Sequence, residues 1–241
     1  MASPRRPRSP KKLVSRVKIT NETIYDRIYA AICERHLPPG IKLSEEKLAK
    51  VFGVSRTRIR EILCRLANEK IVTLITNRGA FVTQPTVEQT RAVFEARRAI
   101  ESATVKRVAE FGEKKSIRRL YEHVQQQYVA REANNRPLMS KLSGEFHVLI
   151  AELAGNPFLY EEMRSLSALT RLIIYQYDSS LMAACLDDEH KEIVATIERH
   201  DPVSAEQLMV EHLRHIESRI NLNVDAHKVI DLEKIFSSLA V

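Results

Sequence analysis

The fold is decided by GVSRTRIREIL, residues 53–63, in which arginines and aliphatic residues follow a helical period. At about 100° per residue, the aliphatic side chains fall on one face and form a single core-facing stripe. This stripe consists of Ile59, Ile62, Leu63 and Leu66. Arg56, Thr57 and Arg60 project from the opposite side, and Arg58 lies on a flank. Ser55 is placed to cap the helix, which we expect to run to about Glu69.

The arginines stand at an unusual place for cations. Positive charges near the N-terminus of a helix oppose the helix dipole, at a cost of about 0.3–1 kcal/mol each. An anionic partner explains why a helix would carry Arg56, Arg58 and Arg60 there. The alternative is a solvated cationic face on an ordinary bundle helix, and the flanking segments argue against it.

These flanking segments predict two more helices and a hairpin. Apolar spacing predicts a helix over 22–36, which LPPG (37–40) ends. Ser44 can cap a short helix over 45–52 that ends at Gly53. IVTLIT (71–76) and AFVTQ (80–84) read as strands joined by the turn NRG (77–79). Three helices followed by a hairpin is the order of a winged helix-turn-helix, which places its recognition helix in the major groove of DNA.

In such a domain each cationic residue has an expected contact. Arginine can bond the O6 and N7 atoms of guanine bidentately, so Arg56 and Arg60, with Thr57 between them, are candidates for base readout. Phosphate contacts position a protein without specifying sequence. We expect these from Arg58, Lys47 and the helix terminus at Ser55, while Arg78 and Gly79 at the wing tip reach into or beside the minor groove.

Charge is distributed unevenly along the 241 residues, whose formal net charge is +7. Residues 1–20 contain seven basic and no acidic residues, residues 21–84 carry a surplus of four basic residues, and the rest has a deficit of four. A polyanion partner is therefore expected at the N-terminal end. The segment 1–20, rich in Pro, Ser and Arg, is predicted to be a disordered tail.

Beyond Pro85 the strand signal stops and helices follow, the first opened by a capping box of Thr86 and Gln89. Helices are expected over 87–111, 114–133, 138–154, 157–182, 187–199 and 203–221. The predicted organisation is a winged domain over 21–84, an all-α bundle over 85–222 and a helical extension over 223–241. The fold class is thus mainly α.

The segment LPPGIKLSEEKLAKVFGVSRTRIREILCRLANEKIVTLITNRGAFV (37–82) resembles the winged-helix domain of the GntR family of bacterial transcription regulators. The shared frame is L-x-P-G, S-E-x-x-L-A, G-V-S-R-T-x-x-R-E-x-L and R-G-x-F-V. Two positions depart from it: Arg58 stands where the family often has proline, and Glu46 where some members use a DNA-contacting arginine.

Helix phase places three of the eight histidines toward the interior of the predicted bundle: His147, His190 and His212. Spacing alone favours buried histidines with polar partners over a metal site. Over about 91–221 the chain is also similar to the FadR-like branch with its FCD-type helical domain, through RRAIE (97–101), FHVLIAELAGNPFL (146–159), EHKEIVATIERHDPVSAE (189–206) and MVEHL (209–213).

This resemblance implies a divalent metal held by the three histidines and an aspartate, but Ser143 occupies the aspartate position. Imidazole ligands favour zinc or nickel over harder ions. The resemblance also implies a carboxylate effector that binds the metal and Arg97. Arg97 could equally form a salt bridge with Glu101, and Arg171, Tyr175 and Tyr177 are further candidates for the effector site.

The implied protein is no enzyme but a homodimeric regulator, a repressor that binds a palindromic operator in double-stranded DNA and responds to a small organic acid. The chain has no apolar run of about 18 residues and no signal core, and its three cysteines are widely spaced, so we expect a cytoplasmic protein without membrane contact. The alternatives are a metal-responsive regulator, a nucleoid-type architectural protein and a three-histidine zinc hydrolase. The effector, the regulated genes and the sense of regulation lie beyond the sequence.

Overall fold

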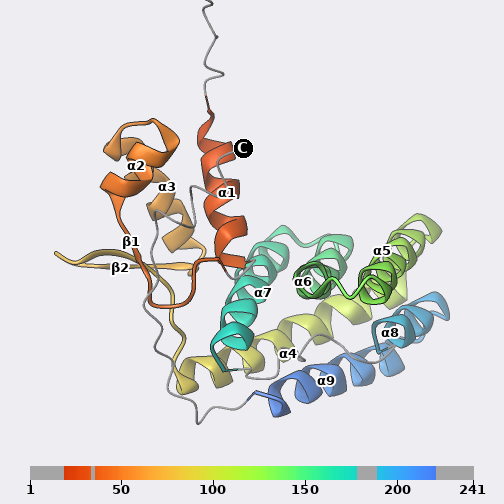
Figure 1. The fold of residues 1–241 in the computed structure, drawn as a ribbon. Helices are drawn as coiled ribbons and strands as arrows, with labels where there is room; N and C mark the ends of the chain where they lie inside the picture. Colours follow the sequence, from red (N-terminus) through yellow and green to blue (C-terminus); the bar gives the residue numbers. More distant parts are fainter. Residues whose placement is uncertain (1–18, 34–35, 178–188, 221–241) are drawn as a thin grey trace, which may run out of the picture.

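The computed structural model describes residues 19–33, 36–177 and 189–220, and shows a small winged domain on a larger helical domain (Figure 1). The predicted basic tail lies outside the described residues apart from Ile19 and Thr20, and the predicted helical extension over 223–241 lies wholly outside them. None of the helices in the described ranges is long and apolar enough to cross a membrane.

The N-terminal helices begin and end where the sequence signals stand. They are α1 (Asn21–Cys33), α2 (Glu45–Phe52) and α3 (Arg56–Asn68). Ser44 caps α2 by accepting a hydrogen bond from the Lys47 amide, and Ser55 caps α3 in the same way through the Arg58 amide. Gly53 ends α2 with a φ of 65°, a left-handed conformation that glycine adopts without a steric penalty.

The wing is a three-stranded antiparallel sheet in the order β1–β3–β2. The strands β2 (Val72–Ile75) and β3 (Gly79–Val82) form the predicted hairpin, with Leu74 opposite Ala80. The prediction of two strands was incomplete, because β1 (Lys42–Leu43) pairs with Phe81 and Ala80 of β3. A two-residue strand has no period of its own, and it forms here because β3 offers an unpaired edge.

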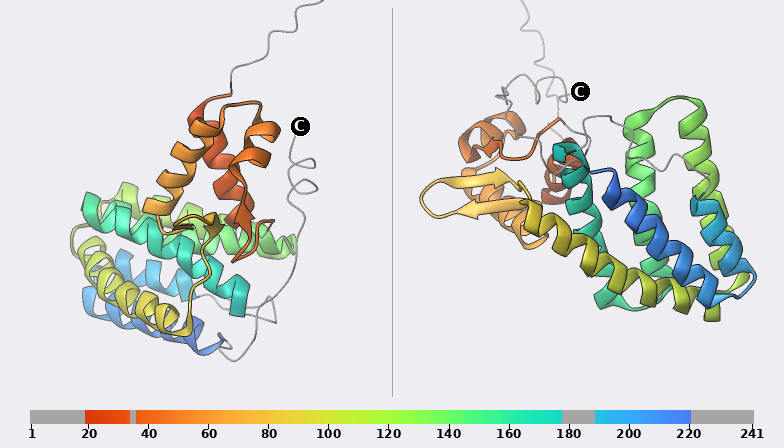
Figure 2. Two further views of the ribbon diagram at one scale, coloured as in Figure 1. Left: turned by 90° about the vertical axis from the view of Figure 1, so that its left-hand side faces the viewer. Right: turned by 90° about the horizontal axis from the view of Figure 1, so that it is seen from below.

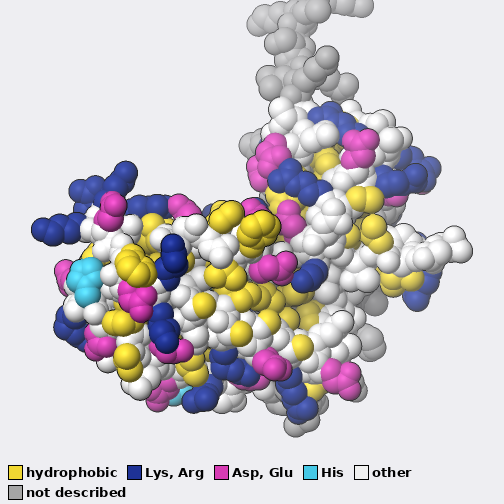
Figure 3. Space-filling model, turned by 180° about the vertical axis from the view of Figure 1, so that it is seen from behind, with side chains coloured by type: hydrophobic (Ala, Val, Ile, Leu, Met, Phe, Trp, Pro, Cys, Tyr) yellow, Lys and Arg dark blue, Asp and Glu magenta, His cyan; other side chains and the backbone are white. Residues whose placement is uncertain are grey.

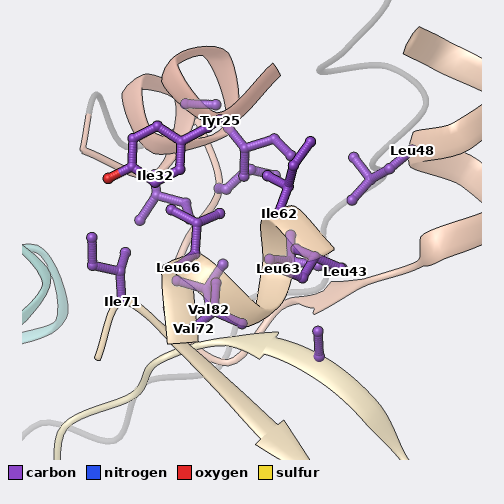
Figure 4. Close-up of a cluster of buried hydrophobic side chains, with 14 of the residues drawn as sticks. Tyr25, Ile32, Leu43, Leu48, Ile62, Leu63, Leu66, Ile71, Val72 and Val82 are labelled. Carbon is purple, nitrogen blue, oxygen red and sulfur yellow. The ribbon is translucent and has the colours of Figure 1, made fainter. Parts of the chain in front are cut away.

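One hydrophobic core holds the winged domain together, and Figure 4 shows it between the helices and the sheet. The stripe of α3 predicted from its period is buried, with Ile59 and Leu66 fully inaccessible. It packs against Ile24, Ile28 and Ile32 of α1 and against residues of the sheet. The apolar stripe of α3 is thereby fixed inward, and its arginine face is left outward.

The helical domain has six helices in the described residues. They are α4 (Val87–Phe111), α5 (Lys114–Glu132), α6 (Arg136–Leu153), α7 (Pro157–Tyr177), α8 (Glu189–Glu198) and α9 (Pro202–Ser218). The capping box of Thr86 and Gln89 is present at the start of α4. α6 starts two residues earlier than predicted, because Asn135 caps it and Pro137 fits the first turn. Residues 178–182, predicted to extend α7, lie outside the described ranges.

Two helices determine how the domains meet. α4 packs along α9 in the bundle, and α7 lies between the bundle and the winged domain (Figure 2). Ala168 and Leu172 of α7 belong to the same buried cluster as the core of the winged domain. The carbonyl of Pro85, in the segment that joins the domains, accepts hydrogen bonds from Tyr177 Oη at 2.8 Å and Gln176 Nε2 at 3.2 Å. α7 is therefore part of both domains.

Candidate functional site

The exposed face of α3 carries the residues predicted to read DNA. Arg56, Thr57 and Arg60 are all solvent-exposed, as helix phase predicted. Figure 3 shows Lys and Arg side chains over the outer part of the winged domain, with acidic side chains among them. Glu45 of α2 forms a bidentate ion pair with Arg60. The cationic face thus remains open, and one of its arginines is already held in place.

The structure turns Arg58 away from that face. Its Nη2 donates to the Ile19 carbonyl at 2.5 Å, and its Nε donates to Asn21 Oδ1 at the start of α1. The side chain is only half-exposed and braces α3 against the segment that leads into α1. These bonds explain why an arginine can stand where the resemblance leads one to expect proline. No phosphate contact is needed to explain it.

The wing places two cations beside the hairpin turn. Arg78 is exposed at the turn, where Asn77 has a φ of 60° and Gly79 a φ of 99°. The Arg78 guanidinium lies 5.7 Å from the centre of the Phe81 ring, and Lys42 Nζ lies 5.9 Å from the same ring. Sequence reasoning missed Lys42, because its place beside the wing depends on the pairing of β1 with β3.

The second site lies inside the helical domain, where His147, His190 and His212 converge from α6, α8 and α9. All three are buried, and one ring nitrogen from each lies within 4.8 Å of the others. His212 Nε2 lies 3.1 Å from His190 Nε2 and 3.4 Å from His147 Nε2. For comparison, two ligand nitrogens of a tetrahedral zinc ion with Zn–N bonds of about 2.0–2.1 Å lie about 3.3 Å from each other.

Each of these histidines is oriented by an acceptor on its other nitrogen. Nδ1 of His147 lies 2.5 Å from Glu101 Oε2, and Nδ1 of His212 lies 2.5 Å from Glu189 Oε2. Nδ1 of His190 lies 2.7 Å from Gln127 Oε1. An ionised carboxylate and an amide oxygen only accept, so all three Nδ1 atoms donate, and in the neutral rings the Nε2 atoms carry the lone pairs.

Three lone pairs that point toward one another repel unless a cation lies between them. Burial is the main reason that the pKa of His147 falls from 6.5 to about 4, which keeps this imidazole neutral and able to bind a metal. The donor set therefore fits a soft divalent ion such as zinc or nickel. Among the described residues the group contains no carboxylate, in line with Ser143, which stands half-buried one turn before His147 on α6.

Arg97 is buried beside this cluster and connected to it. Its Nε donates to Glu101 Oε1 at 2.8 Å, so the salt bridge proposed as an alternative is present. Its Nη1 donates to Thr170 Oγ1 at 3.3 Å, whereas Nη2 is buried without a hydrogen-bond partner in the described part of the chain. Burial opposes ionisation of Glu101, but the charge of Arg97 and the hydrogen bonds from Arg97 and His147 outweigh it and lower its pKa from 4.5 to about 2. A buried cation with one unused donor edge is suited to a carboxylate ligand.

The other residues predicted for the effector site lie on α7. Arg171 Nη2 donates to the hydroxyl of Tyr29 on α1 at 3.1 Å, which directs this arginine to the winged domain. Tyr175 is half-buried one turn later. Tyr177 is buried, and its hydroxyl is bound to the Pro85 carbonyl.

Comparison with known proteins gives two family matches that together span both domains. Residues 20–82 match the gntR family of bacterial regulatory proteins, and residues 92–215 match the FCD domain. The chain belongs to the GntR family. It is a DNA-binding transcriptional regulator with an FCD effector-binding domain, and it is not an enzyme.

Curated relatives agree with this assignment, and solved structures share the fold. The chain is 26% identical to the HTH-type transcriptional repressor RspR of Escherichia coli K12, over 83% of this chain and 88% of the relative. It is also 26% identical to the putative L-lactate dehydrogenase operon regulatory protein of the same organism, over 81% and 84%. In fold it is similar to a GntR regulator from Rhodococcus sp. RHA1 (TM-score 0.72, 24% identity, 83% and 96% coverage) and to E. coli McbR/YncC (TM-score 0.71, 17% identity, 82% and 95% coverage).

In this GntR regulator, sequence reasoning missed the acceptors that orient the histidines. Glu189 directly precedes His190, yet it binds His212 and, at 2.7 Å, His215 of α9. Gln127 comes from α5, and nothing in the sequence connects it to His190. Glu101 was recognised only as a neighbour of Arg97. The signal available for Glu101 was its spacing of four residues from a buried arginine on one helix face.

Proposed function

We propose that this GntR regulator binds a palindromic operator as a homodimer, represses transcription in the cytoplasm, and is released by a small organic acid. The carrying observation is the buried Nη2 of Arg97, which has no partner among the described residues and lies two hydrogen-bonded links from the histidine cluster. An effector carboxylate bound there would satisfy the guanidinium. A divalent ion held by His147, His190 and His212 would supply a Lewis-acidic centre for a second oxygen.

On the DNA side, we propose that Arg56, Thr57 and Arg60 read base edges and that Lys47 and Ser55 contact the backbone. Arg78 and Gly79 position the wing beside the minor groove. Lys42 joins them, since it lies beside Arg78 on the wing. Arg58 is not among the proposed phosphate contacts, because its guanidinium is bound to Ile19 and Asn21. Two-fold symmetry of the dimer implies inverted half-sites.

We propose that α7 carries the signal between the sites. Thr170 of α7 contacts Arg97, while the next residue, Arg171, contacts Tyr29 of the winged domain. Where α6 and α7 meet, Ser167 Oγ donates to the Gly144 carbonyl at 3.0 Å, and a Cβ on Gly144 would stand 2.9 Å from that Oγ. An acid that binds Arg97 changes the position of α7 and, through it, the orientation of the winged domain. The result is a shift between two populations of the dimer with different operator affinity.

The test combines ligand and DNA binding. Small mono- and dicarboxylic acids are screened by thermal shift, with zinc and without, and each hit is measured against an operator obtained by selection from random duplexes. We expect at least one acid to bind the wild type and Arg98→Met but not to bind Arg97→Met. Arg98 is a matched control, since it lies next in sequence but pairs with Glu217. Equal binding to all three proteins would refute the role of Arg97.

A metal-responsive regulator is the second candidate. It is favoured by the orientation of all three imidazoles before any acid is bound. Titration of zinc or nickel into chelator-treated protein, followed by operator binding without any acid, separates the two proposals. A change in operator affinity on adding metal alone would identify the ion as the effector.

A further inference from the structure

Arg60 of the recognition helix is held by a carboxylate from the neighbouring helix. Its Nε and Nη2 donate to Oε1 and Oε2 of Glu45, each at 2.8 Å, and the two residues stand on α3 and α2. We propose that Glu45 is a positioning residue that presents Arg60 to a guanine and so sets the sequence preference of this regulator. The inference rests on the proposed base readout by Arg60 and names the residue that controls it.

The geometry leaves the reading edge of Arg60 available. A guanidinium has five N–H donors. The pair with Glu45 uses the Nε–H and one Nη2–H, on the side edge of the fork. Nη1 makes no hydrogen bond to the residues that the structure describes, so the outer edge of Nη1 and Nη2 can still bond guanine O6 and N7. Glu45 therefore occupies the edge of Arg60 that base readout does not need.

Stability does not explain this pair. The Arg60 side chain is 62% exposed, and an exposed ion pair contributes little to folding. A free arginine samples many rotamers and loses that freedom when it binds, whereas a braced arginine has lost it beforehand. The carboxylate also repels nearby phosphates. Glu45 thus lowers affinity for any DNA while it orients the arginine that distinguishes one sequence from another.

The local structure of α2 keeps Glu45 in position. Glu45 is the first residue of the helix, directly after the cap Ser44, where the helix dipole favours a carboxylate. Its side chain is only 24% exposed, which restricts its rotamers. Glu46, the next residue, is exposed in the same helical turn and makes no such pair with Arg60. The chain therefore offers a matched control with the same charge at nearly the same place.

The experiment selects bound sequences from a randomised duplex library with the full chain as wild type, Glu45→Gln, Glu46→Gln and Arg60→Ala. Both glutamine variants should bind sheared genomic DNA more tightly than the wild type, by about threefold, because each removes one charge close to phosphates. Glu45→Gln alone should lower the preference at the base pair that Arg60→Ala also affects, by about tenfold. In the Arg60→Ala background, Glu45→Gln should produce no further loss.

The outcomes separate this inference from the proposed function. If Arg60→Ala loses the preference at one base pair and Glu45→Gln retains it, the positioning role is refuted and base readout stands. If Arg60→Ala selects the same sequences as the wild type, the proposed readout itself fails. If Glu45→Gln sharpens the preference, the carboxylate masks Arg60 instead of presenting it, and the inference is again overturned.

Discussion

Replacing Glu101 with glutamine should destabilise the effector domain far more than the loss of one ion pair usually does. Glu101 is 1% exposed, and its two oxygens bind Arg97 Nε and His147 Nδ1. Glutamine keeps the shape but loses the charge, and its amide group must face an N–H of one partner. The buried guanidinium of Arg97 is then left without its counter-charge. Breaking such a buried pair costs about 3–5 kcal/mol.

The pKa of Glu101 gives an independent magnitude and a pH window. Folding lowers this pKa from 4.5 to about 2, and the difference corresponds to about 3 kcal/mol. Because the folded pKa is the lower one, this stability is fully present above pH 4.5 and is lost as the pH falls toward 2. The difference between wild type and Glu101→Gln should therefore be largest near neutral pH and shrink in acid.

The assay is urea denaturation of metal-free protein, followed by circular dichroism near pH 7 and again near pH 3.5. Glu206→Gln is the control, because its pair with Lys106 is at a similar distance, 3.0 Å, but partly exposed to solvent, and is worth about 0–1 kcal/mol. The double variant Arg97→Met with Glu101→Leu removes both charges and should lose less stability than Glu101→Gln. If Glu101→Gln costs no more than Glu206→Gln, or if its cost does not change with pH, the account of the buried pair is wrong.

Three further predictions concern the metal, the wing and the contact between the domains. Zinc should raise the melting temperature of chelator-treated wild type, and His212→Ala should abolish this shift. His200→Ala should retain it, because the Nδ1 of His200 binds the Ala109 carbonyl outside the cluster. An equal shift in both variants would refute the site. Arg78→Ala should weaken binding to all duplexes alike and reduce the salt slope by about 1; a change in selected sequence would contradict a backbone role. Tyr29→Phe should preserve acid binding and operator binding but reduce the effect of one on the other, which calorimetry with and without operator measures.

The winged domain was largely predictable, because its determinants are local. The period of α3, the caps at Ser44 and Ser55 and the turn at residues 77–79 are each specified within a few residues. What the sequence did not reveal depends on approach between distant segments. β1 exists only as a partner of β3, and the bonds of Arg58 and Arg60 reach back 39 and 15 residues.

The histidine cluster was predictable in part for the same reason. Helix phase placed His147, His190 and His212 inward, and the resemblance joined them into one set. Neither could identify Glu189 or Gln127 as acceptors, because each acceptor lies on a different helix from the histidine that it binds. A sequence reports which face of a helix is buried. It does not report which helix that face meets.

The contact between α7 and α1, through Arg171 and Tyr29, limits how strongly an effector can change DNA binding. A ligand shifts an equilibrium only by its differential affinity for the two states, and couplings between sites are commonly about 1–3 kcal/mol. The bond from Arg171 to Tyr29 involves a charged donor, and such bonds contribute about 1.5–3 kcal/mol. One hydrogen bond of this kind is therefore large enough to carry most of the signal. We propose that the buried contacts of Ala168 and Leu172 keep α7 packed on the winged domain while this bond changes, because separating them would expose apolar surface. In the proposed dimer, such a change would reorient the winged domain without detaching it and would thereby change the spacing of the two recognition helices.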